Sequence, residues 1–450
     1  MKKRGIPFLS FLFIFCMALV WLPKPVDAAT YDIDFETTSQ AIELINLDTD
    51  TIVYQQNADQ KMYPASTTKI MTYIVAVEHI IDLENTQITV SEEIVNELLG
   101  TGSSLAGVRE GEILTAMQLL NCMMIPSGND AALVLANYVG GGDTQVFIDM
   151  MNEKAAELGC ENTHFMNPHG LHDDQHYTTA DDLYKITKYA MTLPYFMEIC
   201  SKTYYQIPAT NVSPEPRYVY TTNMLIEPNA GGSYYYPYCN GIKTGSHDQA
   251  GYCLVSTAVK DGYSYMCIAL GAPSVDDQGN RVSTNGAFVD TKNLYIWAFD
   301  NLRLKTVLSS DESVCDVTLN LAWNKDKLLL VPERSYSTIL PKDISETSVI
   351  ITPDVPESID APVKKGDVIG TATLSYVGQE LATINLVASE SVERSEVLHS
   401  VDTMNEVIHS QWFQIIAGVI AALVLIYLIL ALIYNRKKKK LRKVKKYRRM

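Results

Sequence analysis

The spacing of apolar positions changes several times along the chain, and each change predicts an element. Apolar runs at 41–47 and 52–55 flank the polar turn Asp48-Thr49-Asp50, which predicts two adjacent strands. After Pro64, a residue suited to the start of a helix, apolar residues recur at roughly helical spacing and predict a buried helix. These apolar residues are Ile70, Met71, Ile74, Val75 and Ile81.

Similar patterns predict further helices and a run of antiparallel strands. The helices are expected at 115–124, 130–138, 147–158, 179–193 and 291–302. The strands are expected at 241–245, 251–260 and 264–271, and Asp261-Gly262 joins the last two as a tight turn. Between these groups, residues 204–238 are rich in tyrosine and contain several prolines, and we expect them to be irregular.

From Thr306 the pattern changes to short apolar or alternating segments separated by Pro, Gly and Asp. Such segments occur at 316–321, 328–331, 348–351 and 371–376. They predict a small all-β domain, in which no residue has a convincing catalytic setting. Residues 390–411 are expected to form a helical stalk.

Both ends of the chain have the composition of membrane-targeting segments. Residues 1–29 combine a basic start, an apolar centre and small residues, which predicts a cleaved signal peptide, with an uncleaved anchor as the alternative. Residues 412–434 are 23 uncharged, mostly apolar residues, long enough to span a bilayer. The tail 435–450 holds eleven Lys and Arg and no acid, so we expect it in the cytoplasm at anionic lipid, with most of the chain outside.

Charge excludes nucleic acid as a partner of the exported part. The whole chain has a net charge of −16, of which the first 29 residues contribute +3 and the tail +11, so the remainder carries −30. A surface this acidic repels a phosphate backbone. The basic tail has a simpler role at the membrane than as a nucleic-acid patch.

Seven cysteines follow the predicted signal peptide, and an odd number leaves at least one of them without an intramolecular disulfide. Cys122, Cys253 and Cys267 lie within apolar runs and are interpreted as small buried hydrophobic residues. A disulfide between Cys160 and Cys200 stays open at this point. No Cys-x-x-Cys sequence occurs, so neither a zinc knuckle nor a redox pair is indicated.

The chemistry-bearing candidates begin with Ser66 and Lys69, which lie three residues apart and therefore on one face of the predicted helix start. A serine hydroxyl becomes an effective nucleophile when a neighbouring base takes its proton. Lysine can be that base when desolvation makes its neutral form accessible, and an apolar helix start offers this setting. Taken alone, the pair has an ordinary alternative, a capping serine beside a solvated lysine.

Two tripeptides downstream change that balance. Ser127-Gly128-Asn129 lies in a turn between two predicted helices, and Lys243-Thr244-Gly245 lies on a predicted strand. The lysine can meet a carboxylate, the threonine can donate a hydroxyl hydrogen bond, and the glycine leaves space for a substrate along the strand. Taken alone, each tripeptide also has an ordinary structural reading, as turn and cap chemistry or as a strand end.

Residues 164–176 hold four histidines and two aspartates, which raises the question of a metal site. The segment has no helical or strand spacing that would aim these side chains at one point, and no His-Glu-x-x-His sequence. We therefore expect a polar loop beside a cleft and no metal.

The order Ser-x-x-Lys, Ser-x-Asn, Lys-Thr-Gly resembles that of penicillin-binding proteins and class A β-lactamases. Flanking segments are similar to the serine D-alanyl-D-alanine carboxypeptidases, the low-molecular-mass penicillin-binding proteins, and the resemblance covers residues 31–388. These segments are Pro126-Ser127-Gly128-Asn129-Asp130-Ala131-Ala132, Asn162-Thr163-His164-Phe165, Asn167-Pro168-His169-Gly170-Leu171 and Lys365-Gly366-Asp367-Val368-Ile369-Gly370.

The resemblance implies an α+β fold, with a helical cluster and an antiparallel sheet around the site, followed by a small all-β domain and one C-terminal transmembrane helix. The expected division is a signal peptide at 1–29, a catalytic domain at 30–304, an all-β domain at 305–392, a stalk at 393–411, a transmembrane helix at 412–434 and a cytoplasmic tail at 435–450.

The family's site residues map onto motif positions of this chain. The resemblance implies that Ser66 is acylated, with Lys69 as its general base, while Ser127 and Asn129 complete the proton network and hold the peptide. It also implies that Lys243-Thr244-Gly245 binds the terminal carboxylate.

The remaining implications concern the oxyanion and the ligands. The backbone N–H groups of Ser66 and Ser246 would form the oxyanion hole. The implied substrate is the peptidoglycan stem peptide ending in D-Ala-D-Ala, cleaved to free D-Ala and a shortened peptide. β-Lactams are the implied inhibitors, and no metal or organic cofactor is needed.

This chain departs from parts of the family pattern. Ser246 follows the Lys-Thr-Gly motif where some members have histidine, and His247 comes one position later. Some members have an arginine before that strand, whereas this chain has Thr221-Thr222-Asn223, with Arg217 nearest. Help at the carboxylate from Arg281 therefore stays open. Many members also end in an amphipathic helix on the membrane, whereas this chain is expected to cross it.

Two alternatives remain. One is a β-lactamase or a cross-linking transpeptidase on the same scaffold, although no segment clearly supplies the deacylating glutamate of a class A β-lactamase. The other is a non-enzymatic penicillin sensor. The sixteen residues after Tyr434 are too few for a signalling domain, so a sensor would need a partner recruited by the tail.

Overall fold

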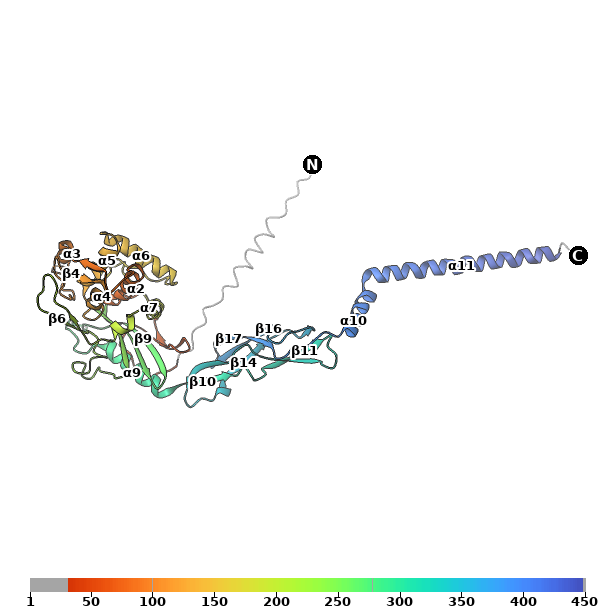
Figure 1. Ribbon diagram of the computed structural model, residues 1–450. Helices are drawn as coiled ribbons and strands as arrows, with labels where there is room; N and C mark the ends of the chain where they lie inside the picture. Colours follow the sequence, from red (N-terminus) through yellow and green to blue (C-terminus); the bar gives the residue numbers. More distant parts are fainter. Residues whose placement is uncertain (1–30, 99, 277, 448–450) are drawn as a thin grey trace. The chain divides into compact units, whose positions relative to one another are not determined.

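The computed structural model describes residues 31–98, 100–276 and 278–447, so the predicted signal peptide lies outside the described residues. The described chain forms two compact units (Figure 1). The first comprises the described residues up to Val307 with Ser337–Ile350 and Ser375–Leu381. The second comprises Leu308–Tyr336, Ile351–Leu374 and the residues from Ala382 onwards.

A five-stranded sheet in the order β2-β1-β9-β8-β7 forms the centre of the first unit. All neighbouring strands are antiparallel, and β7 is an edge strand. The strands are β1 (Ala41–Asn46), β2 (Thr51–Gln56), β7 (Cys239–His247), β8 (Gly251–Lys260) and β9 (Tyr263–Ala272). The predicted strands are thereby confirmed, including the turn at Asp261-Gly262.

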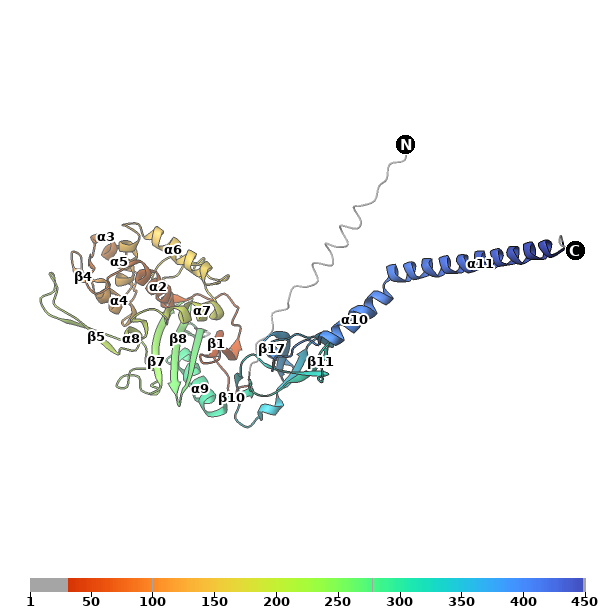
Figure 2. The same ribbon diagram turned by 45° about the vertical axis from the view of Figure 1, so that its right-hand side comes forward.

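Alternate residues of these strands enter two separate cores, because successive side chains of a strand point to opposite faces. Met266 and Ile268 of β9 pack with the helical cluster, whereas Cys267 and Ala269 pack with α9 (Gly286–Asn301). The helical cluster contains α2 (Lys69–His79), α3 (Glu92–Glu97), α4 (Ala116–Met124), α5 (Asn129–Val139), α6 (Thr144–Glu157), α7 (Ala180–Ala190) and α8 (Phe196–Cys200). Figure 2 shows α9 on the opposite side of the sheet from α2, α4 and α5.

The Ser66 segment differs in detail from the prediction. Residues Ala65–Thr68 form a 3-10 turn, η1, and the α-helix α2 follows it directly. The helix is buried as expected, but Ile81 is fully exposed, so its inclusion in the apolar face was wrong. The helix ends at His79, and Ile80 is extended, with φ −106° and ψ 104°, which removes Ile81 from the helical periodicity.

Four short strands complete the first unit's helical side. β3 (Gln87–Thr89) pairs with β4 (Ile113–Thr115), and β5 (Tyr204–Ile207) pairs with β6 (Arg217–Tyr220). The second pair corrects the expectation that 204–238 is irregular throughout. Strand pairing there depends on residues ten or more positions apart, which the prolines and tyrosines of the segment obscure.

The C-terminal region is rich in strands, as expected. One sheet has six strands in the order β14-β16-β17-β12-β11-β15, and β10 and β13 form a separate pair. The elements are β10 (Leu302–Leu308), β11 (Cys315–Asn320), β12 (Lys327–Pro332), β13 (Tyr336–Pro341), η2 (Glu346–Ser348), β14 (Ile350–Asp354), β15 (Ser358–Asp360), β16 (Val368–Tyr376) and β17 (Gln379–Ala388).

Two helices end the described chain, α10 (Glu396–His409) and α11 (Gln411–Tyr447). Within α11, Gln411–Lys438 has a mean hydropathy of 3.1 over its most apolar window, which makes it long and apolar enough to cross a membrane. This confirms a candidate spanning helix at the place where 412–434 was predicted.

All seven cysteines in the described part of the chain are free. Six are buried, among them Cys122, Cys253 and Cys267, which confirms their interpretation as buried apolar residues. Cys160 and Cys200, left open as a disulfide pair, do not form one.

Candidate active site

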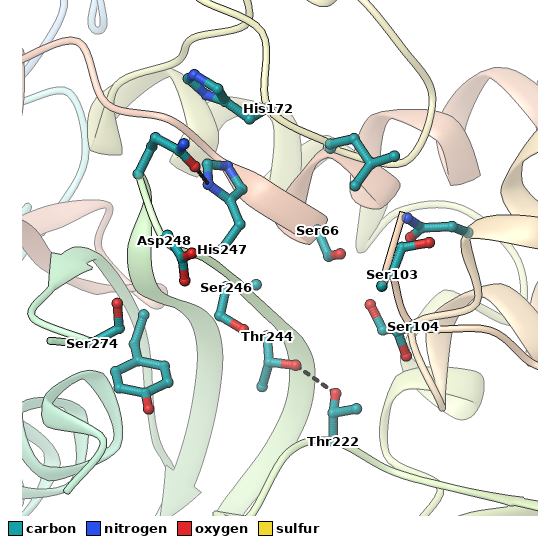
Figure 3. A pocket seen from close by; sticks show the side chains of 18 of the residues that line it. Ser66, Ser103, Ser104, His172, Thr222, Thr244, Ser246, His247, Asp248 and Ser274 are labelled. Carbon is teal, nitrogen blue, oxygen red and sulfur yellow. Dashed lines mark hydrogen bonds between the residues drawn. The ribbon is translucent and has the colours of Figure 1, made fainter. Parts of the chain in front are cut away.

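A cleft of about 730 Å³ opens beside β7 and the start of α2. Six of the eight predicted site residues line it: Ser66, Ser127, Asn129, Thr244, Gly245 and Ser246. The other two, Lys69 and Lys243, are buried next to these residues, with 0% and 1% of their surface exposed. Figure 3 shows Ser66 in the middle of the cleft, between Ser246 on the strand and Ser104 on a loop.

Lys69 is held by three oxygens. Its Nζ lies 2.9 Å from Ser66 Oγ and donates to Asn129 Oδ1 at 2.6 Å and to the carbonyl oxygen of His169 at 2.8 Å. A neutral amine has two protons and one lone pair. Because Asn129 Oδ1 and the His169 carbonyl oxygen can only accept, they take both N–H bonds of the amine and leave its lone pair directed at the Ser66 hydroxyl.

The environment of Lys69 favours that neutral amine. Burial lowers the pKa of Lys69 well below its usual value, and the nearby charge of Lys243 lowers it further, while Asp130 partly opposes the shift. The solvated-lysine reading of the Ser-x-x-Lys motif is therefore wrong.

The backbone at Ser66 is packed from two sides by glycines. A Cβ on Gly245 would stand 2.8 Å from the Ser66 nitrogen, and a Cβ on Gly170, whose φ is +87°, would stand 1.8 Å from the carbonyl oxygen of Ala65. Only residues without a side chain allow this approach. The close approach brings β7 and its Ser246 next to the Ser66 backbone.

The turn that carries Ser127 is tied to the neighbouring loop that contains Ser104. Ser127 has a φ of +65°, in the left-handed region, and the Asn129 nitrogen donates to Ser104 O at 2.9 Å. The buried carboxylate of Asp130 accepts from the nitrogens of Ala106, Gly107 and Val108 at 2.9, 2.8 and 3.1 Å.

Asp130 therefore fixes the loop that contains Ser103 and Ser104, which also line the cleft. This role of Asp130 was not predicted from the sequence. Its only signal was its place directly after the Ser-x-Asn motif.

Lys243 and Thr244 form the second polar group of the cleft. Lys243 Nζ donates to the carbonyl oxygen of Thr244 at 2.8 Å, and burial lowers the pKa of Lys243 to about 7. The hydroxyl of Thr244 lies 2.5 Å from that of Thr222, which also lines the cleft (Figure 3). Thr222 occupies the segment where arginine was sought from the family pattern.

The two arginines considered for the carboxylate have different settings. Arg217 forms a bidentate ion pair with Glu112, with its Nη atoms 2.8 and 3.1 Å from the carboxylate, and it does not line the cleft. Arg281 does line it.

The histidine-rich loop has a structural role beside the site, because its His176 forms hydrogen bonds with neighbouring segments. His176 accepts from the Met166 nitrogen at Nδ1, so its Nε2 donates to Thr68 Oγ1, which in turn donates to Ala65 O. Burial lowers the pKa of His176 to about 3, consistent with a neutral ring. The loop borders the cleft through Gly170 to His172, as expected, and no group of three metal-binding side chains occurs within the described ranges.

Comparison with known proteins matches both the N-terminal and the C-terminal region to a protein family. Residues 27–274 match the family model of D-alanyl-D-alanine carboxypeptidase, and residues 303–394 match that of the penicillin-binding protein 5 C-terminal domain. The D-alanyl-D-alanine carboxypeptidase DacF of Bacillus subtilis is 28% identical over 396 residues, which cover 86% of this chain and 95% of the relative.

Solved structures have the same fold. Penicillin-binding protein 5 from Haemophilus influenzae superposes with a TM-score of 0.63 at 24% identity, over 81% of this chain and 100% of that one. The Streptomyces K15 DD-transpeptidase superposes with a TM-score of 0.54 at 28% identity, over 60% of this chain and 100% of that one. Because the first family model covers more than half of the chain, the chain belongs to the D-alanyl-D-alanine carboxypeptidase family and is a serine D-Ala-D-Ala carboxypeptidase.

Proposed function

We propose that Ser66 is the nucleophile and Lys69 its general base. Ser66 Oγ attacks the carbonyl carbon of the penultimate D-Ala while its proton moves to the lone pair of Lys69 Nζ. The observation that carries this assignment is the pair of acceptors, Asn129 Oδ1 and His169 O, on the two other sides of that nitrogen.

The negative charge that develops on the substrate oxygen is stabilised by the backbone N–H groups of Ser66 and Ser246. The C–N bond then breaks, and the proton held by Lys69 reaches the leaving D-Ala nitrogen through the Ser127 hydroxyl. A water molecule attacks the acyl carbon in the second half of the reaction, again with Lys69 as base. Asn129 holds both Lys69 and the peptide.

The terminal carboxylate of the substrate binds at Thr244, beside Gly245 and above the buried Lys243. A hydroxyl donor and an ammonium suit a carboxylate through charge-assisted hydrogen bonds. The Thr222 hydroxyl supports this proposal. It forms a hydrogen bond with the Thr244 hydroxyl, as donor or as acceptor, and so orients Thr244 in the cleft.

The substrate is the peptidoglycan stem peptide ending in D-Ala-D-Ala, and the products are D-Ala and the shortened peptide. A β-lactam acylates the same Ser66 and keeps its leaving group tethered, which inhibits the enzyme. The cellular role that follows is cell-wall synthesis and remodelling. No cofactor takes part in these steps.

Incubation of the full-length chain in detergent with a D-Ala-D-Ala pentapeptide tests the assignment. Released D-Ala should be measurable with the parent chain and absent with Ser66→Ala. Mass spectrometry after benzylpenicillin should find an adduct on the peptide that contains Ser66. An adduct that persists in Ser66→Ala contradicts the assignment.

A second candidate activity is transpeptidation, which the similarity to the Streptomyces K15 DD-transpeptidase favours. Both reactions share the acyl-enzyme and differ in the group that attacks it. Adding an amine acceptor such as a D-amino acid distinguishes them, because a carboxypeptidase yields mainly the shortened peptide and a transpeptidase yields the exchanged one.

We also propose that the chain is exported after removal of residues 1–29 and is anchored by the apolar part of α11, with the basic tail in the cytoplasm and both folded units outside. The exposure of the large apolar side chains at 412–434, on a helix long enough to cross a bilayer, supports the anchor. A chain ending near Ser410 should be soluble and keep its activity on small peptides. Loss of activity in a folded, truncated chain would assign the helix a further role.

A further inference from the structure

The hairpin of β5 and β6 presents three tyrosines on one face. Tyr204 lies directly opposite Tyr220, and Gln206 lies opposite Tyr218, so all four side chains leave the same side of the pair. The tyrosines are 56%, 65% and 53% exposed, in the order Tyr204, Tyr220, Tyr218. The rings of Tyr204 and Tyr218 are 6.3 Å apart between centroids.

The other face of the hairpin fixes it to the domain. Ile207 and Val219 point inward and are buried, and Arg217 is paired with the buried Glu112. The ladder continues past the strands, because the Thr221 nitrogen donates to Thr203 O at 2.8 Å. The three tyrosines therefore lie on a rigid support and not on a free loop.

The hairpin leads directly along the chain into the wall of the cleft. Tyr220 precedes Thr222 by two residues, and Thr222 lines the cleft and contacts the Thr244 hydroxyl. A molecule that lies along this face is thereby close to the carboxylate end of the cleft. None of the three tyrosine hydroxyls has a hydrogen-bond partner within the described part of the chain, so all can meet a ligand.

The chemistry of this face fits a carbohydrate. Aromatic rings offer flat apolar surfaces for the C–H faces of pyranose rings, while phenol hydroxyls and the Gln206 amide offer hydrogen bonds to sugar hydroxyls and acetamido groups. The face itself contains no charged side chain. A membrane surface or an acidic partner would instead require a basic face.

We propose that the Tyr204, Tyr218 and Tyr220 face binds the glycan strand of peptidoglycan. The inference rests on the proposed function, since stem peptides are attached to that glycan. Holding the glycan on the hairpin keeps stem peptides near Ser66 and raises their effective concentration there. Soluble stem peptides lack this benefit, so the site affects only the polymeric substrate.

Glycan strands freed of their peptides are the probe, immobilised and titrated with the full-length chain in detergent. The double variant Tyr204→Ser with Tyr220→Ser should weaken binding about tenfold or more. The matched control is Tyr138→Ser, an exposed tyrosine on α5 outside the hairpin, which should bind like the parent. Tyr220→Phe should keep most of the binding, because the ring is retained.

Activity provides the second readout. The double variant should keep its kcat/KM on a soluble pentapeptide within about twofold and lose about five- to tenfold on intact peptidoglycan. Equal glycan binding by parent and double variant overturns the proposal, as does a parent that does not bind. Dimers of the parent that disappear in the double variant, with glycan binding unchanged, assign the face to a second copy of the chain instead.

The two proposals fail separately. A parent that binds glycan but releases no D-Ala from pentapeptide contradicts the proposed function and leaves the glycan site in place. A parent that cleaves pentapeptide without binding glycan contradicts only the glycan site.

Discussion

Lys69 Nζ lies 2.9 Å from Ser66 Oγ, and both atoms come from one turn of chain at the start of α2. Sequence spacing alone places the two side chains on one face, but it does not direct the amine. The direction comes from Asn129 and from the His169 carbonyl, which lie 60 and 100 positions further along the chain than Lys69. The pair can transfer a proton because distant elements orient it.

Replacing Lys69 by arginine tests this geometry. A guanidinium stays protonated at every accessible pH and has no lone pair to offer the Ser66 hydroxyl. We expect Lys69→Arg to slow acylation by benzylpenicillin by about a thousandfold or more, comparable to the loss of a general base at a serine nucleophile. The measurement is the rate of adduct formation by mass spectrometry. Acylation at the parent rate in a folded variant excludes Lys69 as the base.

The pH profile of kcat/KM should have two limbs of different origin. The lowered pKa of Lys69 means that its neutral form is present above that pKa, so activity is lost as pH falls through it. The pKa of Lys243 is lowered to about 7, so its cation, and with it carboxylate binding, is lost as pH rises through about 7. Lys243→Arg should move only the alkaline limb upward. An unchanged alkaline limb in that variant would assign it to another group.

Asp130→Asn tests the tie between the Ser-x-Asn turn and the loop that contains Ser103 and Ser104. An amide has one acceptor oxygen and an NH₂ group that faces the N–H donors of 106–108, so at least one hydrogen bond to the loop is lost. We expect a loss of about 1–3 kcal/mol in stability and a roughly tenfold fall in kcat/KM. Limited proteolysis within 100–108 should become faster.

The matched control is Asp143→Asn, which changes a carboxylate that caps α6 through the Gln145 nitrogen. It should cost a little stability and leave both proteolysis of the loop and activity unchanged. Faster proteolysis in both variants would mean a general loss of stability and no specific role for Asp130.

Much of the fold follows from the spacing of apolar residues. Strands β8 and β9 appear as apolar runs because both of their faces are buried, and α4 and α5 appear from their apolar periodicity. The predicted apolar helix face was wrong at Ile81. The helix ends at His79 because the backbone becomes extended at Ile80, and the spacing of apolar residues does not reveal this. Family membership and enzyme class followed from three motifs in order, and the comparisons confirm both.

Other parts of the site depend on contacts between distant segments. The ties from Asp130 to 106–108 and from Thr222 to Thr244 have no periodic signature, so no spacing rule could have found them. The burial of Lys243 on an edge strand was also not expected, because edge strands are usually solvated on one side. The roles of the individual site residues stay predictions.

Glu43 provides a test of stability outside the cleft. It lies on β1, is fully buried, and neither carboxylate oxygen has a hydrogen-bond partner among the described residues. Burial and, to a smaller extent, the charge of Asp181 raise the pKa of Glu43 to about 8, although Lys185 partly opposes this shift. Since the folded state holds this proton more tightly than the unfolded state, Glu43 favours folding below about pH 4.5 and loses that contribution as pH rises through about 8.

Glu43→Gln removes the titration and keeps the shape of the side chain. We expect the variant and the parent to unfold at similar denaturant concentrations near pH 5, and the variant to be more stable by about 3–4 kcal/mol near pH 8. Urea unfolding at both pH values measures the difference. A stability difference that is the same at both pH values would mean that Glu43 is already ionised in the folded protein.

The last prediction concerns what makes this site a carboxypeptidase site. Lys243 is buried, and its Nζ donates to the Thr244 carbonyl oxygen, while the Thr244 hydroxyl lines the cleft. If the ammonium charge anchors the substrate's terminal carboxylate, Lys243→Ala leaves that carboxylate poorly paired. The expected penalty is about 2–4 kcal/mol, or roughly a thirtyfold to thousandfold loss in kcat/KM.

A substrate amidated at its terminal D-Ala lacks the charge, so it should react slowly with the parent, and Lys243→Ala should hardly change its rate. Measuring both substrates with both proteins gives a double-mutant-type cycle whose coupling term isolates the ion pair. Equal losses on the free acid and the amide would mean that Lys243 acts through the pKa of Lys69, which its charge lowers, and not on the carboxylate.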